Sequence, residues 1–367
     1  MDQDIGLRDL PLRDDLRGQT PYGAPQLEVP IRLNVNENPY PPSEALVHDI
    51  AAAVAEVAGG LNRYPDREAW ALRADLADYI AEREGVRLDV NQVWAANGSN
   101  EVMLQLLQAF GGPGRVALGF APTYSMYPEY CRDTFTRWVA EPRRDDFSLD
   151  PEAAVKAVVE HGATIVLLAS PNNPTGTALP LDTIEAVCAA APGVVVVDEA
   201  YGEFRRPGTP SALTLLGAHP RLVVTRTMSK AFAMAGTRLG YLAGSAAIVD
   251  ACRLVRLPYH LGAVTQIVAR TALCHAKDLL AQVDVLRAER DDLVTWLRGR
   301  GHAVAETDAN FVLFGQFDNR RAVWQGLLDR GVLIRETGPE GWLRVSIGTP
   351  EENAAFRAAL EDVGASR

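Results

Sequence analysis

Three lysines are the only side-chain amines of this sequence, and one of them has an unusual setting. Lys156 and Lys277 fall in polar helical patterns, where a lysine is typically a solvated surface charge. Lys230 lies in TRTMSKAFAMAGTR, directly after an apolar run and among hydroxyl side chains and an arginine. An amine in such a setting can bond covalently to an aldehyde or act as a base. We therefore predict that Lys230 is a catalytic residue.

Further polar side chains follow other apolar runs. Asp198 ends the run VVVVD, Tyr201 follows it in DEAY, and Asn173 lies in SPNNPTG after TIVLLA. In open α/β sheets, ligands bind outside the carboxyl ends of the strands. We expect these side chains to meet Lys230 at one sheet edge. Taken alone, Asp198 also suits a helix N-cap, and SPNNPTG also suits a turn.

A fourth segment has the composition of a phosphate-binding helix start. NGSNE follows the short run VWAA and opens the helical pattern EVMLQLLQAF, so its first backbone N–H groups lack helical partners. Hydroxyl and guanidinium groups around Lys230 add further donors, and arginine forms strong charge-assisted bonds with phosphate. The predicted phosphate-binding residues are Gly98, Ser99, Asn100, Thr227, Ser229 and Arg238.

This set of groups predicts pyridoxal 5′-phosphate as the cofactor. That molecule needs a lysine for its aldehyde, an acid beside its pyridine nitrogen and anchors for its phosphate. Asp198 supplies the acid, because a carboxylate favours the protonated ring nitrogen. Asn173 and Tyr201 can hydrogen-bond the phenolic oxygen. We expect Lys230, Asp198 and Tyr201 to be the catalytic residues.

The elements that must position these side chains follow the pattern of an α/β protein with a mainly parallel sheet. Short apolar runs alternate with longer helical patterns. The predicted strands are 115–119, 164–169, 194–198 and 221–225. The predicted helices are 68–84, 101–110 and 181–190. The glycine-rich stretch GGPGRVALG precedes its strand instead of following one, so it lacks the arrangement of a dinucleotide site.

Apolar content and predicted secondary structure divide the chain into three parts. Residues 1–35 have too little apolar content for a core, and we expect an arm that packs on a partner subunit and on the smaller domain. Residues 36–250 are expected to form a large cofactor-binding domain. Residues 251–367, with a long charged helix at 277–300 and strands at 310–315 and 342–348, are expected to form a smaller α+β domain.

Composition narrows the range of partners. The chain has 36 basic and 47 acidic residues, so it lacks the basic surface that nucleic acid requires. No segment has the pattern of a signal peptide or a membrane span, and we expect a cytoplasmic protein with no membrane partner. Neither the cysteines nor the histidines have metal-ligand spacing, and we expect no metal site.

Several of these motifs carry a family resemblance. SPNNPTG, DEAY, TRTMSKAFAMAGTRLGY, LNVNENPYPPS (33–43), NRYPD (62–66) and LRVSIG occur in an order that resembles the fold-type I aminotransferases. Their combination is similar to the histidinol-phosphate aminotransferases of actinobacterial type, from about Leu10 to Phe356. The resemblance implies a mainly parallel seven-stranded sheet between helices, a smaller α+β domain, bound pyridoxal 5′-phosphate and a homodimer.

The resemblance also implies roles for individual residues. Lys230 would hold the cofactor and then move the substrate proton, and Tyr124 would stack on the pyridine ring. Tyr64 would reach the phosphate from the partner subunit. Arg344 would bind the carboxylate of glutamate. The remaining expected substrate-binding residues are Tyr22 and Arg335, at the substrate phosphate, and Asn36 of the NENP motif.

The implied reaction is transamination between L-histidinol phosphate and 2-oxoglutarate in histidine biosynthesis, giving imidazole acetol phosphate and L-glutamate. An aromatic amino acid aminotransferase would share every cofactor residue and differ at the phosphate end of the substrate. A related lyase or decarboxylase would release product without 2-oxoglutarate. A cofactor-sensing regulator would need an added DNA-binding domain, and the residues before NENPYPPS are too few and too acidic for one.

Overall fold

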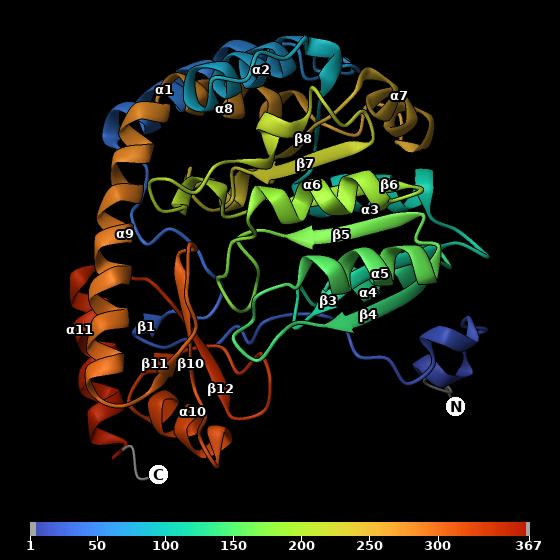
Figure 1. Cartoon of the computed structure of the whole chain (residues 1–367). Helices are drawn as coiled ribbons and strands as arrows, with labels where there is room; N and C mark the ends of the chain where they lie inside the picture. The colour runs from blue at the N-terminus through green and yellow to red at the C-terminus, as the bar shows by residue number, and fades with distance from the viewer. Residues whose placement is uncertain (1–4, 365–367) are drawn as a thin grey trace.

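A seven-stranded sheet lies at the centre of the larger part of the molecule (Figure 1). The computed structural model describes residues 5–364. The strand order is β2-β8-β7-β6-β5-β3-β4, and β8 runs antiparallel to both of its neighbours. The mainly parallel α/β fold predicted from the sequence is therefore confirmed. The strands are β2 (Val93–Ala96), β3 (Val116–Ala121), β4 (Arg137–Pro142), β5 (Ile165–Ala169), β6 (Val194–Asp198), β7 (Leu222–Thr227) and β8 (Gly240–Ala243).

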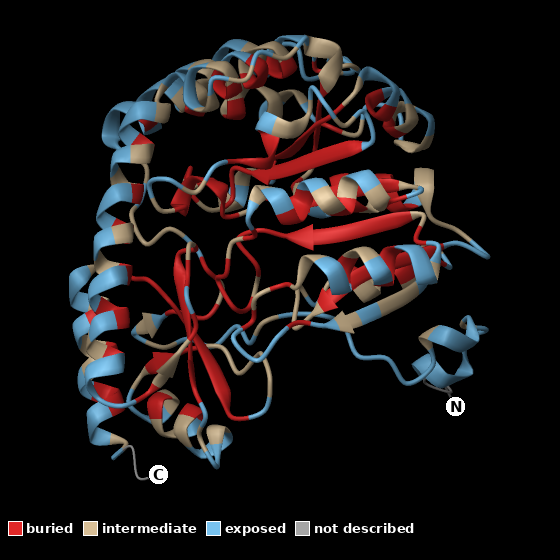
Figure 2. Cartoon of the chain, viewed as in Figure 1, coloured by how far each residue is buried: buried red, intermediate tan, exposed pale blue. Residues whose placement is uncertain are grey.

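Helices cover both faces of this sheet because its strands are apolar on both sides. In β6, Val195 and Val197 pack on one face with α2, α5 and α6, while Val194 and Val196 pack on the other with α3, α4 and α7. Figure 2 shows the inner strands buried, the edge strand β4 partly exposed and the outer helix surfaces exposed. The helices are α2 (Trp70–Glu84), α3 (Ser99–Phe110), α4 (Tyr127–Asp133), α5 (Pro151–His161), α6 (Leu181–Ala190) and α7 (Ala246–Val255).

The start of α3 differs from the sequence prediction in a way that affects function. The helix begins at Ser99 instead of residue 101, because Gly98 has φ 85° and forms the N-cap. Few residues other than glycine adopt this backbone conformation. Ser99 and Asn100 thus lie in the first helical turn, where their N–H groups have no intrahelical acceptors.

A second group of elements packs beside the central sheet (Figure 1). The long helix α9 runs from the helices α1 and α8 down to a three-stranded sheet of order β12-β10-β9, and β1 pairs in parallel with β11. The helices of this group are α9 (Ala276–Gly299), α10 (Arg320–Asp329) and α11 (Pro350–Asp362), whereas α1 (Glu44–Ala58) and α8 (Ala263–Cys274) lie with α2 (Figure 1). The strands are β1 (Ile31–Arg32), β9 (Ala303–Val304), β10 (Phe311–Gly315), β11 (Val332–Leu333) and β12 (Trp342–Ser346).

The segment before β1 has little regular structure. Two short 3₁₀ turns occur, Leu7–Asp9 and Asp14–Leu16, and most residues from 5 to 30 are exposed. Tyr22 and Ala24 nevertheless line the cavity at the ends of β5, β6 and β7. Residues 1–4 of the expected arm lie outside the described residues, and its contact with a partner subunit stays a prediction. Within residues 5–364, no helix is long and apolar enough to cross a membrane.

Candidate active site

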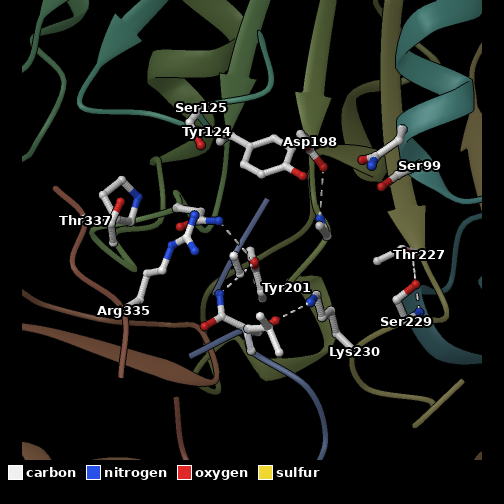
Figure 3. Close-up of a pocket in the computed structure, with 18 of the residues that line it drawn as sticks. Ser99, Tyr124, Ser125, Asp198, Tyr201, Thr227, Ser229, Lys230, Arg335 and Thr337 are labelled. Carbon is white, nitrogen blue, oxygen red and sulfur yellow. Dashed lines mark hydrogen bonds between the residues drawn. The ribbon is translucent and has the colours of Figure 1, made fainter. Parts of the chain in front are cut away.

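A cavity of about 250 Å³ lies at the carboxyl ends of β5, β6 and β7, where the sequence predicted a ligand site. Figure 3 shows Ser99, Thr227 and Ser229 at one end of it and Arg335 and Thr337 at the other. Side chains that the sequence analysis singled out line much of its wall. They are Tyr22, Asn36, Ser99, Asn100, Tyr124, Asn173, Asp198, Tyr201, Thr227, Ser229, Lys230, Arg238, Arg335 and Arg344.

Lys230 lies between the two ends of the cavity (Figure 3). It follows β7 by three residues, and its Nζ donates a hydrogen bond of 2.9 Å to the carbonyl oxygen of Val35. Burial of the amine lowers the pKa of Lys230 to about 8, and the positive charges of Arg344 and Arg238 contribute to this shift. About a tenth of the amine is therefore neutral at pH 7, and this is the form that attacks a carbonyl or accepts a proton.

Asp198 ends β6 and is only 7% exposed. Tyr127 donates to its Oδ2 at 3.0 Å, and the hydroxyl of Thr225 donates to its Oδ1 at 3.2 Å. Burial raises the pKa of Asp198, although the hydrogen bonds from Tyr127 and Thr225 oppose the shift. These two donors orient the carboxylate at the cavity wall. An oriented, buried carboxylate favours a cationic N–H group beside it, such as a pyridinium.

One end of the cavity carries the groups expected to bind phosphate (Figure 3). The Thr227 hydroxyl donates to Ser229 Oγ at 3.0 Å, and Arg238 Nη1 donates to the same oxygen at 3.2 Å. The N-terminus of α3 faces this cluster, because a Cβ atom at Gly98 would lie 2.6 Å from Arg238 Nη2. A helix N-terminus, hydroxyl groups and an arginine in one place form a cradle suited to a phosphate dianion.

Three polar side chains that line the cavity are linked by hydrogen bonds. The Tyr201 hydroxyl accepts hydrogen bonds from Asn36 Nδ2 at 3.0 Å and from Asn173 Nδ2 at 3.4 Å. Asn36 is buried with φ 56°, and its backbone N–H donates to Ser346 Oγ at 2.8 Å. These bonds fix Tyr201 and the side-chain amides of Asn36 and Asn173 in the cavity wall, where they can contact a bound ligand.

Arg344, on β12, brings a second cation to the cavity. Its Nη1 donates to Asn173 Oδ1 at 2.5 Å and its Nη2 to the carbonyl oxygen of Asn34 at 2.9 Å. Its buried Nε has no hydrogen-bond partner among the described residues. Burial lowers the pKa of Arg344 to about 10, so the guanidinium remains charged near neutral pH. A buried arginine with an unused donor suits a carboxylate ligand.

The far end of the cavity is closed by the N-terminal segment. The hydroxyls of Tyr22 and Ser125 share a hydrogen bond of 2.9 Å, and Arg335 Nη2 donates to the carbonyl oxygen of Gly23 at 3.3 Å. Thr337 lies beside Arg335 (Figure 3). This end therefore combines one guanidinium with several hydroxyl groups, which suits an anionic substrate group.

Two tyrosines predicted at the cofactor have different positions. Tyr124 lines the cavity near Asp198, and its ring packs edge-on against Tyr127 with ring centroids 5.6 Å apart (Figure 3). Tyr64 lies outside the cavity of its own chain. It is 79% exposed, and its ring stacks on Tyr259 at a centroid distance of 4.3 Å.

Sequence reasoning missed residues that act through three-dimensional contacts. Tyr127 and Thr225 orient Asp198, and Ser125 and Thr337 line the far end of the cavity. The contact of Thr225 could have been predicted from the sequence, because Thr225 pairs with Asp198 on the adjacent parallel strand. The role of Tyr127 depends on how α4 packs on the sheet, and no motif signals that packing.

The groups present fit pyridoxal phosphate better than a metal. An amine, an oriented carboxylate and a phosphate cradle surround one cavity, in keeping with the aldehyde, ring nitrogen and phosphate of that molecule. Within residues 5–364, no three histidine, cysteine, aspartate or glutamate side chains are arranged to hold a metal ion.

Comparison with known proteins gives consistent matches over nearly the whole chain. Residues 28–360 match the model of the family described as aminotransferase class I and II. The chain is 67% identical to the histidinol-phosphate aminotransferase of Thermobifida fusca, over 97% of this chain and 96% of the relative. It is 63% identical to histidinol-phosphate aminotransferase 3 of Burkholderia lata, over 98% and 97% of the two chains.

A solved structure shows the same fold. The histidinol-phosphate aminotransferase of Sinorhizobium meliloti, crystallised in complex with pyridoxal-5′-phosphate, superposes with a TM-score of 0.82 at 24% identity. The match covers 92% of this chain and 91% of that chain. The fold is therefore that of the fold-type I aminotransferases.

Proposed function

The chain belongs to the class I and II aminotransferase family, and from this premise we propose that it transfers an amino group between L-histidinol phosphate and 2-oxoglutarate. The products would be imidazole acetol phosphate and L-glutamate, and the reaction is a step of histidine biosynthesis. The observation that carries the proposal is the 67% identity, over 97% of the chain, to a relative named histidinol-phosphate aminotransferase.

We propose pyridoxal 5′-phosphate as the cofactor, with its phosphate in the cradle formed by Ser99, Asn100, Thr227, Ser229 and Arg238. When bound, this cofactor supplies an electron sink that stabilises negative charge on the amino-bearing carbon of the substrate. Asp198 would hold a proton at the pyridine nitrogen. Tyr201 and Asn173 would donate hydrogen bonds to the phenolic oxygen, and Tyr124 would cover one face of the ring.

Lys230 has two proposed tasks. Its neutral amine, which the lowered pKa makes available, would hold the cofactor aldehyde before substrate arrives. Once substrate has taken its place, the amine would remove the proton from the amino-bearing carbon of the substrate and hold it for the next proton transfer. The hydrogen bond to Val35 limits the positions of Nζ, so the base is kept at the cavity wall.

The substrates would bind between the cofactor and the N-terminal segment. Arg344 would pair with the carboxylate of glutamate or 2-oxoglutarate, using the Nε donor that lacks a partner. Arg335 and Tyr22 would bind the phosphate of histidinol phosphate, and Asn36 would contact the substrate near Tyr201.

We further propose a cytoplasmic homodimer in which Tyr64 completes the neighbouring phosphate cradle. Exposed apolar side chains around Tyr64 support this proposal, because large exposed apolar groups commonly mark interfaces. They include Leu61, Trp70, Leu254 and Leu257. The division into an arm (1–35), a large domain (36–250) and a small domain (251–367) is proposed with the dimer.

A comparison of amino donors tests the proposed reaction. Wild-type protein would be supplied with pyridoxal phosphate and 2-oxoglutarate, and glutamate formation measured with L-histidinol phosphate and with L-phenylalanine. We expect a higher kcat/KM with histidinol phosphate and no turnover by the Lys230→Ala control. A preference for phenylalanine would instead indicate an aromatic aminotransferase. Product release without 2-oxoglutarate would indicate a lyase or decarboxylase.

A further inference from the structure

A buried cluster of charges lies directly behind the proposed active site. Arg226, on β7 between Thr225 and Thr227, has no exposed surface. Successive side chains of a strand point to opposite faces, so Arg226 points away from the cavity that Thr227 lines. It lies instead on the side of the sheet covered by α2, whose Glu84 it contacts.

Arg226 is the centre of this cluster. Its Nη2 donates to Glu199 at 2.7 Å and to Glu84 at 2.6 Å, its Nε donates to Glu199 at 3.1 Å, and its Nη1 donates to Glu203 at 3.3 Å. Arg205 adds a second guanidinium, with its Nη2 2.9 Å from Glu84. Burial alone would lower the pKa of Arg226, but Glu199 and Glu203 raise it well above its ordinary value.

Two contacts of Arg226, Glu199 and Glu203, lie close in the chain to residues of the proposed active site. Glu199 follows Asp198, and Arg226 precedes Thr227, so their ion pair ties together the ends of β6 and β7. The turn after Tyr201 also packs on this guanidinium, because a Cβ atom at Gly202 would lie 3.3 Å from Arg226 Cζ. One buried side chain thus contacts two strand ends and the turn between them.

The cost of such a cluster indicates a geometric role. Buried ion pairs pay a large desolvation cost and often contribute no more stability than well-packed apolar residues. Several hydrogen bonds from one planar guanidinium do, however, fix the geometry of the groups that accept them. In this chain, the accepting Glu199 follows Asp198, and the accepting Glu203 lies two residues after Tyr201.

We propose that Arg226 is a positioning residue of the active site, holding the ends of β6 and β7 so that Asp198, Tyr201 and Thr227 meet the cofactor together. The inference rests on the proposed pyridoxal phosphate function. Glu199 is the main partner of Arg226, because it accepts hydrogen bonds from both Nε and Nη2 of the guanidinium. Glu199 is itself held in place by hydrogen bonds from Ser211 and from the backbone of Ala212.

The test compares three variants with wild type. Arg226→Lys keeps the charge but loses the planar fork, and Glu199→Gln removes the charge of the main partner at nearly constant size. Arg73→Met is the matched control, because Arg73 is also fully buried but donates to backbone carbonyls of residues 68, 90 and 93. The measurements are the thermal midpoint without cofactor, the Kd of pyridoxal phosphate, and the pH midpoint of the absorbance of the bound cofactor.

We expect Arg226→Lys and Glu199→Gln to weaken pyridoxal phosphate binding by about 10-fold to 100-fold, since small displacements of binding groups have effects of that order. The pH midpoint should shift in both variants, because Asp198 and Thr227 no longer hold their positions. Arg73→Met should lower the thermal midpoint and leave both cofactor measurements at their wild-type values.

The outcomes separate this inference from the function on which it rests. If Arg226→Lys fails to fold, Glu199→Gln decides the question by the same two cofactor measurements. Variants that lose thermal stability but keep wild-type Kd and pH midpoint would show that the cluster is only structural. Wild-type protein that fails to bind pyridoxal phosphate would overturn the proposed function, and this inference with it.

Discussion

At the scale of single residues, burial and neighbouring charge set the chemistry of the site. Lys230 has an amine pKa of about 8, because burial and two arginines disfavour its charged form. Asp198 is also buried, but hydrogen bonds from Tyr127 and Thr225 oppose the resulting rise of its pKa. The two groups that the proposed reaction requires as a base and an anion therefore lie in different local environments.

The lowered pKa of Lys230 leads to a pH prediction. Only the neutral amine attacks the cofactor aldehyde, so the rate of covalent attachment to cofactor-free protein should rise with pH. The rise should have its midpoint near pH 8, not near 10.5, the ordinary pKa of a lysine. Replacing Arg344 with Met removes a positive neighbour and should move the midpoint to higher pH. Stopped-flow absorbance measures both, and a wild-type midpoint near 10.5 would contradict the account.

Asp198 offers a second prediction at this scale. Asp198→Asn keeps the size of the side chain but removes its charge, so the ring nitrogen should no longer be held protonated. We expect kcat to fall by about 10²–10³, as typically follows the loss of one electrostatic partner. Tyr127→Phe removes only one orienting bond and should cost less. Near wild-type turnover by Asp198→Asn would show that another group protonates the ring.

At the scale of elements, sequence patterns predicted the strands that are continuous apolar runs and the helices that have a clear apolar face. The strand at 194–198 and the helix at 181–190 have the predicted bounds, because a run of valines and an amphipathic helix need little context. The strands β4 and β8 were not predicted. β4 is an edge strand with a mixed burial pattern. β8 is only four residues long, and its pairing with β2 and β7 keeps it in the sheet.

The same limit applies to the candidate site. Residues that follow predicted strands, such as Asp198 and Lys230, were foreseen at one sheet edge, since parallel strands bring their ends together. The contact from Tyr127 to Asp198 joins residues 71 positions apart and depends on the packing of α4. The first residue of α3 was also missed, because the positive φ of Gly98 moves the helix start.

Gly98 gives a prediction at the scale of this element. Gly98→Ala would strain the backbone at φ 85° and place a methyl group against Arg238. Gly85→Ala is the matched control, because Gly85 has φ 70° at the end of α2 and nothing within 4 Å of its added Cβ. Gly85 lies in the left-handed helical region, where the strain of alanine should cost about 1–2 kcal/mol of stability. Gly98, with ψ 163°, lies in a region essentially restricted to glycine, where the cost should be about 1–3 kcal/mol. Only Gly98→Ala should raise the Kd of pyridoxal phosphate in a fluorescence titration, and equal Kd values in both variants would argue against the proposed cradle.

At the scale of the whole molecule, the proposed site would be complete only in the proposed dimer. Tyr64 is exposed and outside the cavity of its own chain, yet the family resemblance assigns it to the cofactor phosphate. Exposed Leu254 and Leu257 lie in the neighbouring segment before Tyr259, on which Tyr64 stacks. A second copy of the chain on this surface would cover these apolar groups and deliver Tyr64 to the partner's cavity.

Complementation between two defective chains tests this arrangement. Lys230→Ala chains would be refolded together with Tyr64→Phe chains. If Tyr64 acts across the interface, each mixed dimer has one site with both Lys230 and an intact Tyr64. Amino transfer by the mixture should then exceed the mean of the two separate variants. Activity equal to that mean would place Tyr64 within its own subunit or outside the site.

In the proposed function, Lys230 holds pyridoxal phosphate in the cavity at the ends of β5, β6 and β7. Wild-type protein would be incubated with pyridoxal phosphate, reduced with borohydride to make the attachment permanent, digested and mapped by mass spectrometry. The account predicts one modified peptide, with the added mass on Lys230. Modification of Lys156 or Lys277 in its place, or protein that remains unmodified, would contradict it.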